Sequence, residues 1–291
     1  MVKKINIRSY AKINLSLDVL RRREDGYHDL KMIMHSVNLY DKISITAHKK
    51  GGITIRTNLP YLPVNEKNHV YRAAQLFFEY TNLRCGGLFI QIQKHIPVSA
   101  GLAGGSSNAA AALKGLNYMY GAGLSNTILA ELGKRVGADV PYCIYGGTML
   151  AEGIGEQLTP LPRMPKMPIV LAKPPVNLST PAVFKALSVS SIRLHPDTKG
   201  MIEALRMQNS EGLARRMYNV LEDPAQVVMK QMGAGDLVSD LKHIMLDYGA
   251  LGTLMSGSGP TVFGLFDREE KAKSAAKAAL RVTKDVFVTT T

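Results

Sequence analysis

A glycine-rich segment between a strand pattern and a helix pattern constrains the fold of this chain most strongly. It runs from Pro97 to Ser107 and holds three glycines and two serines in its last seven residues. The residues before it, 88–96, alternate as in a strand, and the alanine run 109–112 favours a helix. The amides of the loop and the positive end of the helix then face the same position, where an anion can bind. The sequence therefore predicts an anion-binding loop.

The loop matches neither of two common nucleotide-binding motifs. No Lys-Ser/Thr pair follows its glycines, as a Walker loop requires, and the glycine spacing is not GxGxxG. The alternative is a glycine-rich connection without a ligand, which the composition disfavours. A second glycine turn, Ser256–Pro260, lies between two apolar strand patterns. Alone it fits a simple hairpin loop, and together with the first loop it fits a second wall of a phosphate site.

The charge balance calls for an anionic partner. The chain has 291 residues, with 36 Lys and Arg against 23 Asp and Glu and a net charge of +13. Nucleic acid, an anionic membrane surface and small phosphorylated ligands all fit such a charge. The tightest basic run, residues 21–23, is followed at once by Glu24 and Asp25. We interpret it as a solvated turn, not as a nucleic-acid patch.

Cysteine usage and hydropathy indicate the compartment. Cys85 and Cys143 have neither a CxxC partner nor histidines at metal-ligand spacing, which disfavours a disulfide framework and a structural zinc site. The N-terminal residues show no apolar signal-peptide region, and no stretch has the apolar length of a membrane span. We therefore expect a soluble, cytoplasmic protein that does not bind membranes.

Strand and helix patterns occur in both halves of the chain. Strand patterns occupy the first 60 residues, and helix patterns follow at 68–80, 106–118 and 125–136. A proline-rich stretch, 155–173, marks a change in composition that we interpret as a domain boundary. Later strand patterns are at 168–172, 251–256, 261–266 and 286–290, with helix patterns between Ser179 and Tyr248 and at 269–281. We predict an α+β protein with domains 1–158 and 159–291.

Two charged residues in apolar surroundings are candidates for acid–base chemistry. Asp139 lies in the stretch 137–141, where Pro141 ends the preceding helix pattern, and Lys12 heads an apolar strand. A lone Asp beside a proline is commonly a turn residue, and a lone strand lysine commonly faces solvent. If both meet at the glycine loop, the carboxylate can accept a hydroxyl proton and the ammonium can stabilise negative charge.

A third candidate is the turn Asp25-Gly-Tyr-His28, which carries an aromatic ring and an imidazole. It fits a hairpin with a packed Tyr27. It also fits a stacking platform for a planar ligand, in which His28 contacts the polar edge of that ligand.

Together these segments resemble the motifs of the GHMP small-molecule kinases. The glycine loop, the Lys12 segment and the turn 256–260 carry the likeness to the superfamily. The stretches 11–15 (AKINL), 25–28 (DGYH) and 137–141 (GADVP) are similar to those of members that act on a cytidine diphosphate ester of methylerythritol. The resemblance spans residue 8 to about residue 266. It implies the two-domain α+β GHMP kinase fold, with the active site in the cleft between the domains.

The resemblance also implies the reaction and its partners. It implies ATP-dependent phosphorylation of the C2 hydroxyl of the methylerythritol unit, in the non-mevalonate route to isopentenyl diphosphate. ATP would be the co-substrate and Mg²⁺ its counter-ion, with no matched protein ligand beyond a loop serine hydroxyl. Nucleic acid would not be a partner. The alternatives are a GHMP kinase of the mevalonate or homoserine type, which the DGYH stretch and Phe184 disfavour, and a basic RNA-binding protein.

Individual roles follow from the matched positions. Asp139 is implied as the base that takes the C2 hydroxyl proton, with Lys12 orienting it and stabilising the alkoxide. The residues implied in ATP binding are Asn68, Lys94, Pro97, Val98, Ser99, Ala100, Gly101, Leu102, Ala103, Gly104, Gly105, Ser106 and Ser107. Those implied in substrate binding are Asn14, Tyr27, His28, Thr180, Phe184, Gly257, Ser258 and Gly259. Tyr27 and Phe184 would sandwich the cytosine, and His28 would hydrogen-bond to its edge.

One residue departs from the family pattern. Asn108 stands where the family commonly has Asp after the two loop serines. An acid in the first turn of a helix is favoured by the helix dipole, by roughly 0.3–1 kcal/mol. Because Asp139 is the expected base, we interpret Asn108 as tuning stability or hydrogen bonding, with activity retained.

Overall fold

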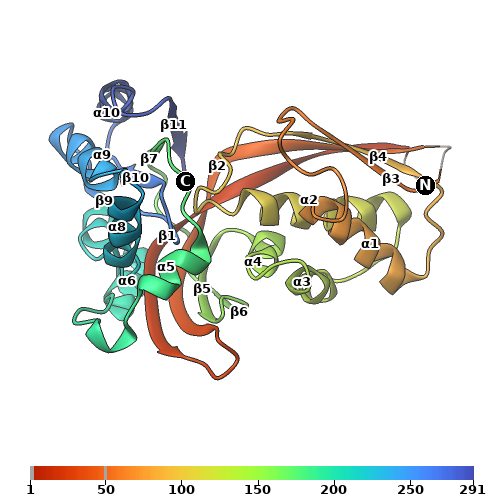
Figure 1. Cartoon of the computed structure of the whole chain (residues 1–291), viewed down its shortest axis with the longest axis horizontal. Helices are drawn as coiled ribbons and strands as arrows, with labels where there is room; N and C mark the ends of the chain where they lie inside the picture. Colours follow the sequence, from red (N-terminus) through yellow and green to blue (C-terminus); the bar gives the residue numbers. More distant parts are fainter. Residues whose placement is uncertain (1–2, 49–50) are drawn as a thin grey trace. The chain divides into compact units, whose positions relative to one another are not determined.

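The computed structural model describes residues 3–48 and 51–291, which divide into two compact units (Figure 1). Unit 1 comprises Met1–Ala11, Tyr40–Val98 and Ala103–Gly146, and unit 2 comprises Lys12–Leu39, Ser99–Leu102 and Gly147–Thr291. Strands β1 (Lys4–Arg22) and β2 (His28–Ala47) each contribute one part to either unit. The compact units therefore do not follow a single cut in the chain. The domain division at residues 158 and 159 stays a prediction.

Unit 1 packs helices against one face of a sheet. Its strands lie in the order β3 (Ile53–Thr57), β4 (Leu88–Gln93), β2, β1, with β4 antiparallel to β2 and parallel to β3. The helices that cover them are α1 (His69–Thr81), α2 (Gly104–Tyr120), α3 (Asn126–Lys134) and α4 (Val140–Tyr145) (Figure 1). Isoleucines at alternate positions of β2 and β4 meet the alanine run of α2 in the core. Small alanines let α2 approach the strands closely.

Unit 2 contains strands in the order β6 (Gln157–Pro160), β5 (Thr148–Gly153), β2, β1, β8 (Tyr218–Asn219). A second, antiparallel sheet has the order β11 (Asp285–Thr290), β7 (Pro168–Lys173), β10 (Val262–Leu265), β9 (Gly252–Met255). The helical elements are α5 (Thr180–Ala186), the 3₁₀ helix η1 (Val189–Ser191), α6 (Thr198–Arg206), α7 (Ser210–Ala214), α8 (Glu222–Gln231), α9 (Leu237–Asp247) and α10 (Glu269–Ala279). Helices α9 and α10 pack against this second sheet (Figure 1). Within the described ranges, no helix is long and apolar enough to cross a bilayer.

Most strand and helix predictions are confirmed, and the exceptions have local causes. The mixed α+β class and the hairpin β9–β10 around residues 256–261 are as predicted. The first part of β2 and the short elements α4, β5, β6 and β8 are not marked by the sequence patterns above. The prediction that Pro141 ends the preceding helix is wrong. Helix α3 ends at Lys134, and Pro141 lies in the first turn of α4, where its missing N–H leaves no bond unmade.

A buried histidine lies in unit 2 between β2 and β5. The His35 side chain places Nδ1 2.9 Å from Thr148 Oγ1, and the residue is 7% exposed. Its Nε2 atom is buried without a hydrogen-bond partner among the described residues. Burial lowers the pKa of His35 to about 4, so the imidazole is neutral at physiological pH.

His35 should make the folded state sensitive to acid. Between about pH 6.5 and the folded pKa, the unfolded chain binds a proton that the folded chain excludes, so stability falls as pH falls through this window. We expect His35 to lower the free energy of unfolding by about 2 kcal/mol between about pH 7.5 and about pH 5. Urea denaturation at both values, for the wild type and His35→Asn, measures this effect. The same dependence on pH in both proteins would contradict the prediction.

Candidate active site

The two glycine turns meet in unit 2. Gly101 has φ +72°, and a Cβ atom there would lie 2.1 Å from the backbone oxygen of Ser256. The Ser256 hydroxyl donates to the Gly101 carbonyl at 3.0 Å. A side chain at position 101 would push the second turn away, so only glycine fits. The turn 256–260 is therefore a hairpin loop that also contacts the 99–102 part of the glycine loop.

Lys12 and Asn14 lie on the same face of β1, against the second glycine turn. Lys12 Nζ donates to Asn14 Oδ1 at 2.6 Å, and the Asn14 N–H donates to Ser256 Oγ at 3.3 Å. A Cβ atom on Gly257 would come within 3.4 Å of both Lys12 Nζ and Asn14 Oδ1. Lys12 is only 4% exposed, so the interpretation of a solvent-facing strand lysine is wrong. An ammonium, an amide and a glycine turn thus share one small volume.

Asn219 positions this second turn, although it is not among the predicted site residues. Its side-chain Nδ2 donates to the carbonyls of Met255 and Gly257, both at 2.8 Å. The Leu221 N–H donates to its Oδ1 at 2.9 Å. Asn219 lies in the two-residue strand β8, within a region dominated by helix patterns, so no local signal marks it.

The rest of the glycine loop forms the start of α2 in unit 1. The helix begins at Gly104, two residues before the predicted start, and the Ser107 N–H donates to Ala103 O at 2.8 Å. The amides of residues 104–106 therefore have no acceptor within the helix and lie at its positive end. The Ser106 hydroxyl makes no hydrogen bond in the described part of the chain. This end of α2 has the chemistry of an anion-binding site.

Asp139 lies immediately before α4, also in unit 1. Its backbone is helical, with φ −81° and ψ −9°, and its carboxylate does not cap its own helix. A Cβ atom on Gly137 would lie 3.7 Å from Ser106 Oγ, so the stretch 137–141 runs beside the first turn of α2. Asp139 and Lys12 belong to different units, and their convergence on one reacting group stays a prediction.

Two residues predicted near the nucleotide use their side chains inside unit 1. Lys94 Nζ binds Asp41 Oδ2 and donates to Asn108 Oδ1 at 3.2 Å, and its side chain is 5% exposed. Asn68 caps α1, because its Oδ1 accepts from the Val70 N–H at 2.9 Å. Their assignment as ATP ligands stays a prediction. The Lys94 side chain also forms a buried ion pair with Asp41.

Asn108 links that ion pair to the glycine loop. Its Nδ2 donates to Asp41 Oδ2 and to Ser9 Oγ, both at 2.8 Å. The Ser9 hydroxyl donates to Ser107 Oγ at 2.8 Å, and the Ser107 hydroxyl donates to Gly104 O at 3.1 Å. A chain of hydrogen bonds thus runs from a buried carboxylate to the first turn of α2. Asp41 and Ser9 are further residues that the sequence analysis missed.

Two aromatic rings of unit 2 stack on each other, and the sandwich of a cytosine between Tyr27 and Phe184 stays a prediction. The rings of His28 and Phe184 stack with centroids 5.0 Å apart and planes at 28°, whereas Tyr27 is 60% exposed. Burial, and then the charge of Arg22, lower the pKa of His28, so its imidazole is neutral near pH 7. Thr180 Oγ1 lies 2.7 Å from Ser258 Oγ, which ties α5 to the second glycine turn.

The substitution Asn108→Asp tests the buried network. It places a second buried carboxyl group about where Asn108 Nδ2 now donates to Asp41, with the Lys94 ammonium shared between the two. We expect burial and the like charge of Asp41 to outweigh Lys94 and to raise the pKa of the new group above its unfolded value. The folded variant then retains a proton that the unfolded chain loses, so its stability deficit grows as pH rises from about 4 through the raised pKa. We expect a deficit of about 1–3 kcal/mol at about pH 8 and a smaller one at about pH 5.

Urea denaturation of the wild type, Asn108→Asp and Asn108→Ala measures this deficit. The alanine variant removes the amide without adding a titrating group, so its deficit should not change with pH. An aspartate deficit of the same size at both pH values would show that no carboxyl pair forms.

Comparison with known proteins identifies the family. The GHMP kinases N terminal domain family matches residues 68–147, and the GHMP kinases C terminal family matches residues 201–284. A 4-diphosphocytidyl-2-C-methyl-D-erythritol kinase from Caldicellulosiruptor saccharolyticus is 46% identical over 98% of this chain and 96% of its own length. This likeness covers both matched regions and the stretches between them.

Solved structures agree. A crystal structure of 4-(cytidine 5'-diphospho)-2C-methyl-D-erythritol kinase superposes with a TM-score of 0.82 at 33% identity and covers 98% of both chains. The homoserine kinase from Cytophaga hutchinsonii superposes with a TM-score of 0.76 at 22% identity, over 99% of this chain and 95% of its own. The second likeness reflects the shared GHMP kinase fold alone. By its near full-length identity to the first group, the chain belongs to the 4-diphosphocytidyl-2-C-methyl-D-erythritol kinase family of GHMP kinases.

Proposed function

We propose that this kinase transfers the γ-phosphoryl group of ATP to the C2 hydroxyl of 4-diphosphocytidyl-2-C-methyl-D-erythritol, giving the 2-phosphate and ADP. The observation that carries the proposal is the 46% identity, over 98% of this chain, to a relative of that name. The span of that likeness covers the stretches 11–15, 25–28 and 137–141. A homoserine or mevalonate kinase is not favoured, because that likeness is confined to the fold. We place the reaction in the cytoplasm, in the non-mevalonate route to isopentenyl diphosphate.

The glycine loop, residues 97–107, is our candidate for the ATP phosphate site. Phosphoryl transfer needs mainly positioning and stabilisation of charge on the phosphate oxygens. The free amides of residues 104–106 and the positive end of α2 supply both. In this proposal Asn68 and Lys94 lie nearer the adenosine. Because the Lys94 ammonium group is paired with Asp41, Lys94 would act through its backbone, just after β4.

Mg²⁺ fits as the counter-ion of ATP. Among the described residues, no three His, Cys, Asp or Glu side chains gather into a metal-binding group. The donor that the loop offers is the Ser106 hydroxyl, so the ion would be held mainly by phosphate oxygens and water, as Mg²⁺ commonly is. Bound there, it would neutralise charge on the transferred group.

Asp139 and Lys12 are our candidates for the proton transfer. In this role the Asp139 carboxylate accepts the proton of the C2 hydroxyl, and the Lys12 ammonium stabilises the alkoxide that forms. Asn14 holds Lys12 Nζ at 2.6 Å and so fixes the direction of its charge. The assignment requires both groups to reach the same hydroxyl.

The cytidine end would lie at α5. Phe184 offers an apolar ring face, and Tyr27 is exposed and able to close over a base. A neutral His28 has one donor, which suits the ring nitrogen of cytosine, or one acceptor, which suits its amino group. Asn14, Thr180 and residues 257–259 would hold the remainder of the substrate. Stacking tolerates any base, so the polar contacts must provide the selection.

A substrate screen tests the function directly. We expect ATP-dependent ADP release with 4-diphosphocytidyl-2-C-methyl-D-erythritol and none above background with mevalonate or homoserine. The reason is that the latter two have no base to occupy the His28–Phe184 region. A coupled ADP-release assay with purified enzyme measures all three. Phosphorylation of mevalonate or homoserine in place of the cytidine compound would overturn the proposal.

The base assignment predicts the effect of Asp139→Asn. Removing a general base commonly lowers turnover by about 10²–10⁴-fold. We expect such a loss in kcat with little change in the KM for ATP, because Asp139 acts on the hydroxyl and not on the nucleotide. The double variant with Lys12→Ala should lose less than the product of the two single losses, if the two groups act on one proton. Wild-type turnover by Asp139→Asn would refute the assignment.

A further inference from the structure

The hairpin between β1 and β2 carries three consecutive arginines on two opposite faces. Its closing backbone bond runs from the Arg23 N–H to Tyr27 O at 2.8 Å. With that register, Arg22 lies directly opposite His28 on the neighbouring strand. Because side chains alternate between the faces of a strand, Arg21 and Arg23 share one face and Arg22 takes the other.

One face of the hairpin is electrically balanced. Arg21 and Arg23 both form ion pairs with Asp29, and Arg23 also pairs with Asp25 at 3.0 Å. Arg23 lowers the pKa of Asp25, and Arg21 and Arg23 lower the pKa of Asp29, so both carboxyl groups remain ionised. Two cations therefore meet two anions on this face.

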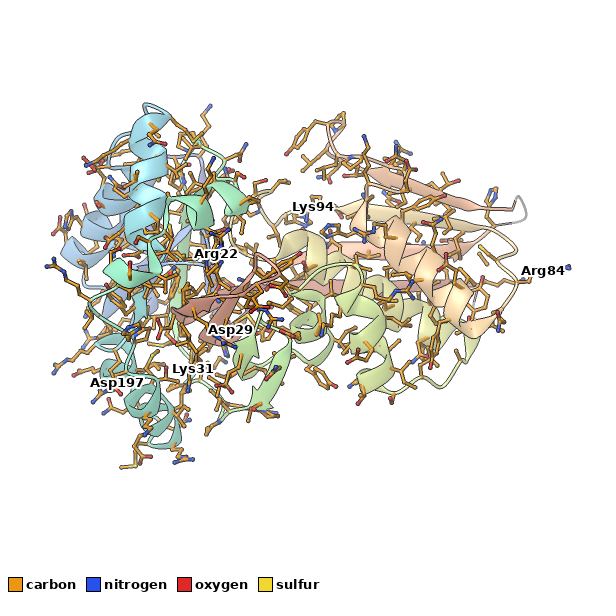
Figure 2. The ribbon with its side chains drawn as sticks, turned by 60° about the horizontal axis from the view of Figure 1, so that its bottom comes forward. Arg22, Asp29, Lys31, Arg84, Lys94 and Asp197 are labelled. Carbon is orange, nitrogen blue, oxygen red and sulfur yellow. The ribbon has the colours of Figure 1, made fainter. Side chains whose placement is uncertain are left out.

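The other face holds a cation without a matching anion. Within residues 3–48 and 51–291, the exposed Arg22 side chain forms no ion pair or hydrogen bond. Its charge acts on His28, whose ring stacks on Phe184. Arg22 and Asp29 lie apart in Figure 2, as expected for opposite faces. A guanidinium group thus stands beside the ring pair with its hydrogen-bonding capacity unused.

We propose that Arg22 binds the diphosphate group of the cytidine substrate. This inference rests on the proposed function, which brings a cytosine to the His28–Phe184 region. In a cytidine diphosphate ester the diphosphate is attached through the ribose to that base, so it lies near the hairpin when the base is bound. Guanidinium groups bind phosphate oxygens in bidentate geometry. Arg22 then distinguishes a cytidine diphosphate ester from uncharged cytidine.

A matched pair of variants isolates this role. Arg22→Gln and Arg21→Gln each remove one positive charge from the same hairpin, so they weaken long-range attraction of anions equally. We expect Arg22→Gln to raise the KM for the cytidine ester about tenfold and to leave the KM for ATP unchanged. Arg21→Gln should change neither. Arg22→Lys should recover part of the loss, because lysine keeps the charge without the bidentate geometry. Equal effects of the two glutamine variants would overturn the proposal.

A direct measurement of binding tests the Arg22 site independently of whether the enzyme catalyses the proposed reaction. Calorimetry with CDP and with cytidine, in the presence of saturating ADP to fill the nucleotide site, gives the ratio of the two affinities. We expect the wild type to bind CDP more tightly than cytidine. In Arg22→Gln the ratio of the two affinities should fall about tenfold, with the affinity for cytidine unchanged. An unchanged ratio would overturn the role of Arg22 whatever the turnover. Failure of the wild type to bind either compound would also overturn it.

A further outcome would separate the two ideas in the opposite direction. A wild type that fails to phosphorylate the cytidine ester, but loses its CDP preference on Arg22→Gln, would overturn the proposed function and support the Arg22 site.

Discussion

The backbone contact between Gly101 and Ser256 is the constraint on which the candidate site of unit 2 depends. A Cβ atom at position 101 would overlap the Ser256 carbonyl, so two turns far apart in sequence approach only because one residue has no side chain. Ser256 then also accepts from the Asn14 N–H, and Asn14 holds the Lys12 ammonium. The position of the Lys12 ammonium therefore depends, through Asn14 and Ser256, on the absence of a side chain at position 101.

Unit 1 fixes its part of the loop by a different means. The fully buried Asp41 carboxylate accepts from Lys94, from Asn108 and from the N–H groups of His95 and Ile96. Taking a carboxylate and an ammonium out of water is costly, and these added donors offset much of that cost. Removing one partner would leave a buried charge unmatched. The first turn of α2 is therefore held by polar groups, whereas the turn at Ser256 is held by close backbone packing.

Local patterns were enough to predict the parts of the site that are local in the chain. The glycine loop, the helix after it and the hairpin around residues 256–261 all follow from residue spacing and glycine chemistry. Asp41 and Asn219 could not be found in this way, because their importance comes from partners that fold next to them from distant positions. A buried and an exposed aspartate look the same in sequence. The pairing of His28 with Phe184, which lie 156 positions apart in the numbering, is non-local for the same reason.

The stack between the His28 and Phe184 rings affects how strongly a base can bind at Phe184. A flat base inserted between two rings needs a centroid separation of about 7 Å, twice the usual contact distance between carbon atoms. The present separation is 5.0 Å, so no base fits between these two rings as they stand. The imidazole covers one face of the Phe184 ring in this structure, so a base that binds at that face has to displace it. Affinity for a base at this face is therefore a difference between two stacking energies, and a weaker-stacking side chain at position 28 would raise it while removing the polar selection.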